Sequence, residues 1–534
     1  MMNGYLIALA VFLAWLGLLY AGHKTKWLEK HSMSPYGPFI MWKTKKGREL
    51  VDRLSSWKRF WGAYARIALW ICAGSMILIT VLLLWEATLV SKVTKAPSPE
   101  LILGIPGLNP VIPLGYGILG LAIAIVVHEL SHGVMTRLGG MKVVSLGLLF
   151  LVFPMGAFVE PDEKELQAAS RSKRSKVYAA GPASNIVVAM VFLLLFSSMM
   201  MTNVQPTNEG ALATGVVEDS PAYRSGISAF SVIASIDGVP MTSSHDFTSR
   251  ESPSPGNTVT VQYYFKGELL TASSVTDGVV VAYTTAGFAA SEYGLKPGMV
   301  LVSINDTIVR NLEVLSATMN LTHADKLVNA TAMSYDRSAG KFVINGSVTQ
   351  ILLSDKYAYY AKYFPGDNKE EYRGKGYLGA GFLPMGVNSR DTDYYSSILA
   401  NPFAGDHSLH DFSMSWLRLI ALPFLELAPI RSPVSDLYHP SGSLAWMPDT
   451  MFWLLANSFY WIFWLNLMVG LTNVLPAVPL DGGYLFRDAL DYIVSRIKGD
   501  YTKEKRENVV GSLTLMVALA ILFLIVWQLV GPAI

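Results

Sequence analysis

The stretch Val127-His128-Glu129-Leu130-Ser131-His132-Gly133 lies inside residues 114–138, an apolar segment long enough to cross a lipid bilayer as a helix. Residues four apart in a helix project from one face, so the imidazoles of His128 and His132 can share a metal ion. Glu129 lies beside that face and can reach a metal-bound water without being a ligand. Hydrolysis by zinc requires this combination, because the metal lowers the pKa of water toward ~7 and a carboxylate takes its proton.

The apolar surroundings of this motif decide between two interpretations. H-E-x-x-H occurs by chance in many soluble proteins, where it is ordinary polar helix surface. Here the flanking residues 119–127 and 133–138 are strongly apolar. Two histidines and a glutamate in a membrane segment are energetically costly unless they serve a function. The setting therefore favours a metal site over an accidental match.

The composition of the chain independently indicates a membrane protein. Of its 534 residues, 51% are hydrophobic and only 15% are charged, against about 25% charged in soluble domains, and the mean hydropathy is +0.36. The net charge of +2 gives no reason to expect a nucleic-acid partner. The single cysteine, Cys72, can form neither an internal disulfide nor a cysteine-based zinc site, so a metal must be held by histidines and carboxylates.

Six segments are long and apolar enough to span a bilayer. They are residues 4–22, 66–90, 114–138, 177–202, 450–473 and 509–531. The first is expected to be a retained helix rather than a signal peptide, because its positive charges follow the apolar stretch. Basic segments at 23–65, 171–176 and 487–506 then fall on one side of the membrane, which should be the cytoplasm.

The long insert 203–410 is accordingly expected outside the cytoplasm. Alternating apolar residues between Gly, Pro and Asn turns predict a soluble, β-rich structure for it. Residues 411–449 begin with an apolar stretch interrupted by charges and a proline, and we expect them to be interfacial or re-entrant. Four N-x-[ST] glycosylation acceptors all fall within the insert, in agreement with the expected side. They are Asn305, Asn320, Asn329 and Asn345.

The insert contains a weak tandem repeat. The first copy runs from residue 219 to 238 and the second from 289 to 305, each with a short helix pattern, a glycine turn and a buried-strand pattern. The repeat resembles the signature of PDZ domains, more closely in the second copy, which has the turn Lys296-Pro297-Gly298. Residues 376–382, Gly-Tyr-Leu-Gly-Ala-Gly-Phe, are either a loop that cradles a carboxylate in such a domain or a plain glycine-rich turn.

A catalytic zinc ion usually keeps three protein ligands and a water, so a third ligand is needed. The best candidate is Asp481, in the stretch 473–483, Asn-Val-Leu-Pro-Ala-Val-Pro-Leu-Asp-Gly-Gly, at the expected cytoplasmic end of the fifth span. Pro476 and Pro479 break regular helix there, and Gly482-Gly483 is expected to let the backbone turn the carboxylate inward. The alternative is that Asp481 simply caps a cytoplasmic helix.

Together these motifs resemble those of the site-2 protease family of intramembrane metalloproteases. The family's H-E-x-x-H signature matches residues 128–132, and its N-x-x-P-x-x-x-L-D-G signature matches residues 473–482 without a departure. A third family feature is matched by Ala180-Gly181-Pro182-Ala183-Ser184-Asn185. The resemblance covers residues 114–202 and 450–490, and a PDZ-type insert between the two catalytic helices also occurs in the family.

The resemblance implies roles for individual residues. His128, His132 and Asp481 would be the ligands of Zn²⁺. Glu129 would act as the general base and later as the proton donor. Asn473 would help to hold the substrate or its oxyanion.

Two further segments are interpreted through the same resemblance. Gly181, Pro182 and Asn185 are expected to serve close helix packing rather than catalysis. Residues 147–159 are apolar but too short for two crossings, and the corresponding region of the family forms a membrane-embedded β-hairpin that can offer an edge strand to substrate. A buried apolar loop is the alternative. With a turn at residues 154–156, the substrate-binding residues would be Phe153, Pro154, Met155 and Gly156.

The predicted fold is an α-helical polytopic membrane protein, with about six transmembrane helices and a membrane-embedded β-hairpin, that carries an extracytoplasmic α/β PDZ-like insert. Six parts are expected along the chain. They are N-terminal helices with a basic loop (1–113), the first part of the catalytic core (114–202), the tandem PDZ-like region (203–410), the interfacial segment (411–449), the second part of the core (450–490), and a basic segment with the C-terminal helix (491–534).

The predicted function is hydrolysis of the transmembrane segments of single-pass, membrane-anchored proteins near the cytoplasmic side, with the insert selecting substrates outside. One alternative is a different H-E-x-x-H membrane protease, of the prenyl-protein type, with Glu163, Glu165 or Glu426 as third ligand. Another is a membrane scaffold or receptor that uses its PDZ-like domains and has a degenerate zinc site. The intact Glu129 argues against the scaffold, because an inactive site has no need of its base. A transporter is disfavoured, since no repeated broken-helix pattern is present.

Overall fold

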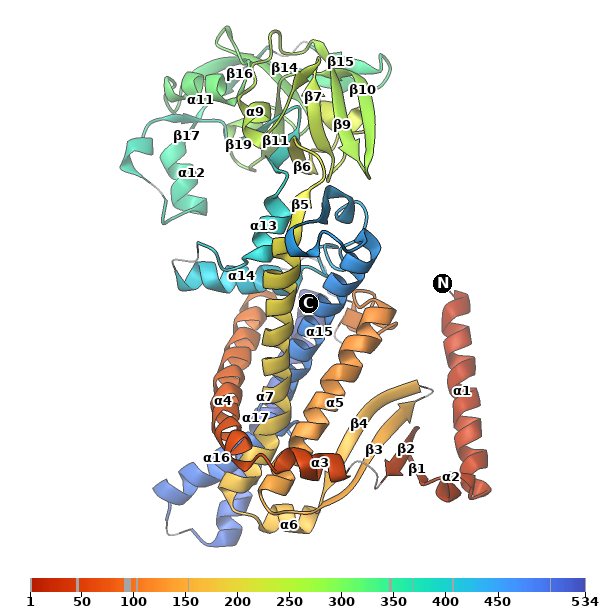
Figure 1. The fold of residues 1–534 in the computed structure, drawn as a ribbon. Coiled ribbons are helices and arrows are strands. Elements are labelled where there is room, and N and C mark those ends of the chain that lie inside the picture. The colour runs from red at the N-terminus through yellow and green to blue at the C-terminus, as the bar shows by residue number, and fades with distance from the viewer. Residues whose placement is uncertain are drawn as a thin grey trace. The chain divides into compact units, whose positions relative to one another are not determined.

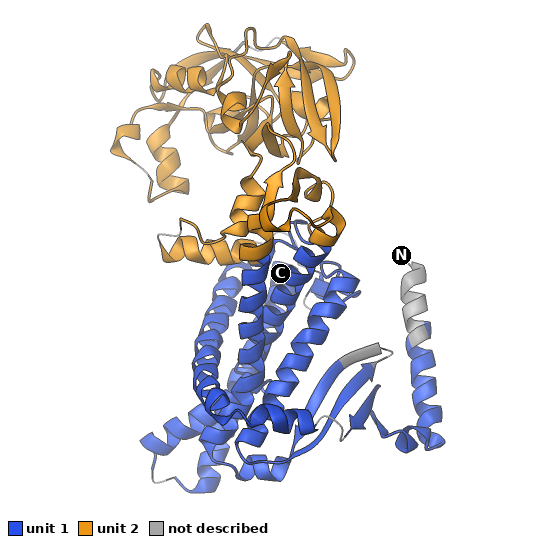
Figure 2. Cartoon of the chain, viewed as in Figure 1, with its two compact units in different colours: residues 1–196, 420–429, 454–534 blue, residues 197–419, 430–453 orange. Residues whose placement is uncertain are grey.

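The computed structural model describes the chain in nine stretches and divides it into two units, which are considered one at a time. The stretches are residues 2–44, 48–90, 98–101, 104–151, 153–344, 348–367, 369–405, 408–499 and 501–533. Unit 1 comprises residues 1–196, 420–429 and 454–534, and unit 2 comprises residues 197–419 and 430–453 (Figure 2).

Five helices in the described residues are long and apolar enough to cross a membrane. They are α4 (Lys58–Leu89), α5 (Leu114–Leu138), α7 with its continuation (Arg171–Asn203), α15 (Asp449–Asn473) and α17 (Lys503–Val530). These coincide with five of the six expected spans, so the polytopic membrane architecture is confirmed. The expected first span, 4–22, lies in helix α1 (Met2–Lys24), which is not among the five. A count of six therefore stays a prediction.

Small residues let the long helices of unit 1 approach closely. A Cβ atom on Gly120 of α5 would lie 2.8 Å from the carbonyl oxygen of Trp461 in α15. A Cβ atom on Gly470 of α15 would lie 2.9 Å from Ile186 in α7. Lipid-exposed helices have no hydrophobic drive to associate, so such close backbone contact contributes much of their attraction.

Ion pairs join two of the three basic segments, 171–176 and 487–506, and a further ion pair joins the segment 23–65 to the end of α5. Arg137, at the end of α5, pairs with Asp52 of α3 (Arg48–Ser55). Arg174 of α7 contacts Asp488 of α16 (Asp481–Ile497) with an Nη2–Oδ1 distance of 2.6 Å. Asp491 forms ion pairs with both Arg171 and Arg506, at 2.5 and 2.8 Å. The expectation that the basic segments share one side is consistent with this clustering; Lys45 and Lys46 lie outside the described residues.

An antiparallel sheet accompanies α5 in unit 1 (Figure 1). Its strands, in spatial order, are β1 (Met33–Tyr36), β2 (Phe39–Thr44), β3 (Val143–Leu151) and β4 (Phe153–Pro161). The expected β-hairpin is therefore present as β3 and β4, while β1 and β2 were not foreseen. Strand β4 is the last in the sheet and packs against α5, where a Cβ atom on Gly133 would lie 3.1 Å from Val159.

The expected turn at residues 154–156 is wrong, because these residues belong to β4. Pro154 pairs with Phe150 and Gly156 pairs with Leu149, so Met155 is an extra residue in the ladder. An edge strand tolerates such a bulge, and a proline, because its outer N–H groups have no partner strand. The side chains of Phe153, Pro154 and Met155 lie outside the described residues.

Unit 2 contains two larger sheets with the same plan. The first, of six strands, follows the order β10 (Glu268–Thr276), β9 (Thr258–Phe265), β7 (Val232–Ile236), β6 (Ala211–Val216) and β20 (Val387–Asp391), with β8 (Val239–Pro240) beside β7. The second, of seven strands, follows the order β15 (Lys341–Val343), β14 (Leu327–Asp336), β12 (Val300–Ile304), β11 (Val279–Thr284) and β19 (Ala380–Pro384), with β13 (Thr307–Ile308) beside β12 and β16 (Val348–Leu352) beside β14.

Each sheet belongs to a module with a repeated element order: strand, short helix, strand, two-residue strand, helix, strand. The helices are α8 (Pro221–Arg224) and α9 (Ser244–Ser249) in module 1, and α10 (Ala289–Glu292) and α11 (Leu312–Asn320) in module 2. The repeat noticed in the sequence is thus a repeat of structure. Module 2 is nested within module 1, because β19 closes the second sheet and β20, directly after it, returns to close the first.

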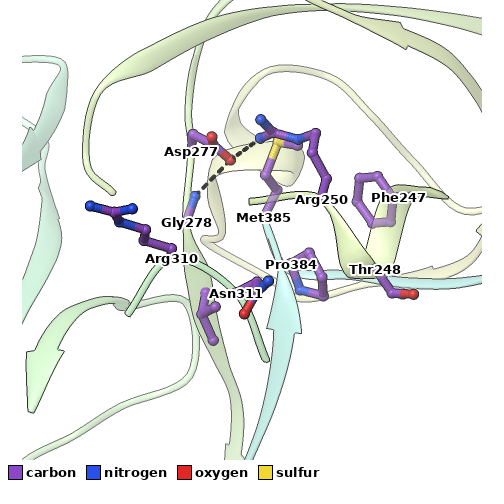
Figure 3. A pocket seen from close by; sticks show the side chains of 10 residues that line it. Phe247, Thr248, Arg250, Asp277, Gly278, Arg310, Asn311, Pro384 and Met385 are labelled. Atoms are coloured by element: carbon purple, nitrogen blue, oxygen red, sulfur yellow. Dashed lines mark hydrogen bonds and ion pairs between the residues drawn. The ribbon is translucent and has the colours of Figure 1, made fainter. Parts of the chain in front are cut away.

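A buried ion pair lies where the two modules join (Figure 3). Asp277, between β10 and β11, has a side chain only 4% exposed, and its Oδ1 lies 2.5 Å from Nη2 of Arg250. The same oxygen accepts a hydrogen bond from the backbone N–H of Gly278 at 2.9 Å. Figure 3 shows the guanidinium of Arg310 turned away from this pair. The cavity beside it measures about 10 Å³, which is too small for an organic ligand.

The remaining elements are short. In unit 1 they are α2 (Trp27–Lys30) and α6 (Glu163–Ala168); in unit 2 they are α12 (Lys356–Tyr363), α13 (Tyr394–Ala400), β5 (Val204–Pro206), β17 (Ser354–Asp355), β18 (Gly376–Tyr377) and β21 (Tyr438–Pro440). Helix α14 (Leu409–Ala421) bridges the unit boundary and has 13 residues, too few to span a bilayer. An interfacial role for residues 411–449 stays a prediction.

Candidate metal centre

Three potential ligands from two distant helices meet within unit 1. His128 and His132 lie one turn apart on α5, and Asp481 is the first residue of α16. The Oδ2 atom of Asp481 lies 3.0 Å from Nε2 of His128 and 3.2 Å from Nε2 of His132. Both histidines are buried, with 7% and 9% of their surface exposed. The sequence prediction that these three residues come together is confirmed.

The geometry of this group fits a zinc ion. Its three ligand atoms lie within 4.8 Å of one another. Bonds of about 2.1 Å in a tetrahedral site would separate neighbouring ligands by about 3.4 Å, close to the two distances seen here. Two imidazoles and one carboxylate are a donor set that catalytic zinc sites use. His128, His132 and Asp481 could therefore hold zinc through Nε2, Nε2 and a carboxylate oxygen.

Gly181 of α7 keeps the space in front of these ligands open. A Cβ atom at this position would lie 2.4 Å from Nε2 of His132 and 2.7 Å from Nε2 of His128. Any larger residue would therefore collide with the two ring nitrogens that would bind a metal. The absence of a side chain at Gly181 is a requirement of the site and not only of helix packing.

The chain between α15 and α16 brings Asp481 to the histidines. Helix α15 ends at Asn473, and the proline-containing residues 474–480 are not helical. The expectation that Gly482-Gly483 turns the backbone is wrong, since both glycines lie in the first turn of α16. The glycines are needed because the start of α16 lies very close to the preceding segment. A Cβ atom on Gly482 would lie 2.2 Å from the carbonyl oxygen of Val474. Asp481 is the first residue of α16, where a helix favours negative charge. The alternative that it caps the helix does not hold, because the N-cap residue is Leu480.

Ionic contacts fix the other turns of α16 against α7. The Asp488 carboxylate accepts from Nη2 of Arg174 at 2.6 Å and from its Nε at 3.3 Å. Arg174 also donates to the carbonyl oxygens of Gln167 and Ala169, at 3.2 and 3.0 Å. Because Asp488 lies two turns after Asp481 on the same helix, this clamp limits how far the Asp481 carboxylate can move.

Glu129 stands beside the ligand group without belonging to it. Its side chain is half-buried, and its Oε2 atom accepts a hydrogen bond from the backbone N–H of Val159 in β4, at 2.9 Å. The carboxylate is thus held between the metal-binding helix and the edge strand of the sheet. This is the position that a base acting on a bond presented along β4 would need.

The remaining candidate residues are Asn473 and the three glutamates considered as alternative third ligands. The amide nitrogen of Asn473 donates to the carbonyl oxygen of Val469, at 3.0 Å, within its own helix. Glu165 accepts from the backbone N–H of Lys142, at 2.7 Å. Among the described residues, the metal-binding group that contains both histidines includes Asp481 and none of the three alternative glutamates.

The contribution of α7 to the site was missed from the sequence. Val177 and Asn185 contact the two imidazoles, and Gly181 lies between them in the chain. Their spacing of four residues, which places them on one helix face, was visible in the sequence. The sequence predicts only helix packing for Gly181 and Asn185, because a pattern of small residues does not show which neighbouring helix it meets.

The chain combines a His-Glu-x-x-His helix, a carboxylate from far along the sequence that lies beside its imidazoles, and several helices of membrane-spanning length. This combination is characteristic of metallopeptidases. Residues 116–521 match Peptidase family M50, and the chain belongs to this family. Zinc is the cofactor that the family and the His128–His132–Asp481 group indicate.

Two relatives illustrate the similarity. An uncharacterized protein of Methanocaldococcus jannaschii is 32% identical over 174 residues, which cover 32% of this chain and 46% of the relative. A Clostridium perfringens protein named "Putative zinc metalloprotease" is 28% identical over 180 residues, which cover 29% of this chain and 52% of the relative. The chain thus spans about half the length of these curated relatives.

Replacing Gly181 with alanine should weaken zinc binding. The added Cβ would force both imidazoles to shift, and overpacking of this kind costs about 1–3 kcal/mol, which corresponds to about a 5- to 160-fold loss of affinity. Competition with a chromophoric chelator on the purified, detergent-solubilised chain measures the affinity. Gly74→Ala is the matched control, because nothing lies within 4 Å of a Cβ atom at that position in α4. Equal zinc affinity in the two variants would contradict the proposed site.

Proposed function

We propose that this protein is an intramembrane zinc endopeptidase that hydrolyses peptide bonds in the transmembrane segments of membrane-anchored proteins. The observation that carries the proposal is the His128–His132–Asp481 group on membrane-length helices, with the carboxylate of Glu129 held beside the edge strand β4. Membership of Peptidase family M50 supports the reaction class. The positive-inside argument favours cleavage near the cytoplasmic side, with the insert on the other side of the membrane.

The residues of the site divide the chemistry among them. His128, His132 and Asp481 hold the metal, which when bound polarises the substrate carbonyl and lowers the pKa of water. Glu129 accepts the proton of the attacking water and later delivers it to the amine that leaves. Asn473, whose amide lies one turn beyond Val469, would rotate away from that carbonyl to support the substrate or its oxyanion.

Strand β4 is the proposed site of substrate alignment. Carbonyl groups in a membrane helix are hydrogen-bonded internally, so cleavage requires the helix to unwind locally and its backbone to find new partners. Within the described parts of the chain, strand β4 pairs with β3 along one edge only. Its other edge can pair with an extended substrate by β-augmentation, with residues 153–156 at the start of the strand as the first contacts.

The insert is proposed to select substrates through a groove in module 2. The groove measures about 280 Å³ and lies between α11 and the segment 376–382. Leu315, Met319 and Phe382 give it an apolar lining, and Lys356 and Lys375 add positive charge. An extended peptide that ends in an apolar residue and a free carboxylate matches both features. Such an end stays on the membrane anchor when a membrane protein whose C-terminus lies outside is trimmed there, so the insert would admit substrates of this orientation that have been cut once.

Replacing Glu129 with glutamine should abolish cleavage of a model single-pass transmembrane substrate in proteoliposomes. The amide cannot accept the proton of the attacking water, and loss of a general base typically costs about 100-fold or more in rate. Zinc content should stay at that of the unchanged chain, because Glu129 is not a ligand. Full activity in the Glu129→Gln variant would contradict the mechanism. A chain that binds no zinc at all would instead favour the scaffold alternative.

Replacing Lys375 with glutamate should slow cleavage of a substrate whose external end is a free, apolar C-terminus. The reversed charge repels the terminal carboxylate, whereas the same substrate with an amidated C-terminus should be cleaved equally by both forms. Lys341→Glu, on the exposed face of β15 in the same module, is the matched control for added negative charge. The groove assignment fails if Lys375→Glu leaves the rate ratio between the free and amidated substrates unchanged.

A further inference from the structure

One face of α7 touches both imidazoles through the nitrogens that do not face Asp481. The carbonyl oxygen of Val177 lies 2.8 Å from Nδ1 of His132. Two turns further along, the side-chain amide of Asn185 lies 3.3 Å from Nδ1 of His128. Asn185 is completely buried. Helix α7 therefore supplies one polar partner to each ring.

The protonation of the two rings decides what those partners must be. An imidazole that offers Nε2 to a metal carries its proton on Nδ1, and that N–H needs an acceptor when it is buried. The Val177 carbonyl oxygen can only accept, so it already meets this need for His132. Asn185 has both an acceptor, Oδ1, and a donor, the NH2 group. A half-turn of the amide exchanges the two without changing its shape.

The hydrogen bonding of Asn185 shows which orientation the site requires. As it stands in the structure, the amide turns its NH2 group toward Nδ1 of His128. Its Oδ1 atom is then buried without a hydrogen-bond partner among the described residues. Buried polar atoms are paired in the great majority of cases, so this arrangement is unfavourable. The reversed amide places Oδ1 against the Nδ1–H of His128, which then has the acceptor that a metal-binding tautomer needs.

We propose that Asn185 is a positioning residue of the metal centre. Its Oδ1 accepts a hydrogen bond from Nδ1–H of His128, selects that tautomer and directs Nε2 toward the metal. The proposal rests on the proposed ligand role of His128. It gives α7 an orienting function for both histidines, through a main-chain carbonyl at Val177 and a side chain at Asn185. Only the second of these can be removed by substitution.

The test measures Zn²⁺ affinity of the purified full-length chain by competition with a chromophoric chelator. Asn185→Leu keeps a similar volume but has no acceptor, and its affinity should fall by about 10- to 100-fold, as for other residues that orient metal-binding histidines. Asn185→Asp keeps the acceptor and loses the donor, and its affinity should stay near that of the unchanged chain. The visible spectrum of the Co²⁺-loaded protein should change in the leucine variant and not in the aspartate variant.

Two controls separate this role from a structural one. Ser184→Ala removes a neighbouring buried hydroxyl, which lies 2.6 Å from Ser131 Oγ and 2.5 Å from the Tyr64 hydroxyl, without touching either imidazole. It should leave zinc affinity unchanged. His128→Ala should lose tight zinc binding, which checks the ligand assignment itself. If the leucine variant does not accumulate as folded protein, Asn185→Ala removes the amide without adding bulk.

Three results would overturn the proposal while leaving the proposed function intact. They are wild-type zinc affinity in Asn185→Leu, an equal loss in Asn185→Asp, which would make the amide a donor, and an equal loss in Ser184→Ala, which would make the effect one of packing. Tight zinc binding by His128→Ala would instead remove the ligand assignment, and the proposal with it.

Discussion

One carboxylate oxygen, Oδ2 of Asp481, approaches two imidazole nitrogens to 3.0 and 3.2 Å, and the rest of unit 1 is arranged to permit that approach. Asp481 lies 353 residues after His128 in the chain. In a helix surrounded by lipid-facing residues, each of these groups would be costly on its own. A metal shared by all three side chains would compensate for their burial. This contact therefore constrains the positions of α5 and α16 relative to each other.

The residues around the three side chains permit this approach in two ways. Glycines leave space for the ligands, and an ion pair restricts the movement of α16. Gly181 and Gly482 lack the side chains that would push α7 and α16 away from the ligands. The Arg174–Asp488 pair holds α16 in register with α7. Buried ion pairs often add little net stability, so we interpret this one as a constraint on geometry. The hydrogen bond from Val159 to Glu129 links the same site to β4. Substrate alignment and proton transfer would then share one strand edge.

The sequence predicted the parts of this site that depend on local spacing. The separation of His128 and His132 identifies a shared helix face, and the motif around Asp481 identifies the third candidate ligand. Long-range contacts were not predictable in the same way. Strands β1 and β2 were missed because their residues have no alternating pattern of their own. They join the sheet through the pairing of β2 with β3. The role of Asn185 was missed because nothing in its segment shows which ring it would face.

The same limit applies to the insert. The repeat identified by its glycine turns corresponds to α8 with β7 and to α10 with β12. Its nested closure, in which β19 and β20 return to different sheets, depends on pairings between residues 96 to 180 positions apart and leaves no periodic pattern in the sequence. Identification of the insert as PDZ-like, and its role in substrate selection, remain our proposals. They rest on the repeat and on the groove in module 2.

The central claim is that α5 and α16 together hold a single zinc ion. X-ray absorption at the zinc edge of the purified full-length chain tests it most directly, because the signal reports ligand type and distance at the metal. We predict one zinc per chain, with two imidazole nitrogens and carboxylate or water oxygens at about 2.0–2.2 Å. The imidazole signal should be unchanged in Glu129→Gln, and zinc should be lost in Asp481→Ala. A zinc site that persisted with the same spectrum in Asp481→Ala would contradict the account.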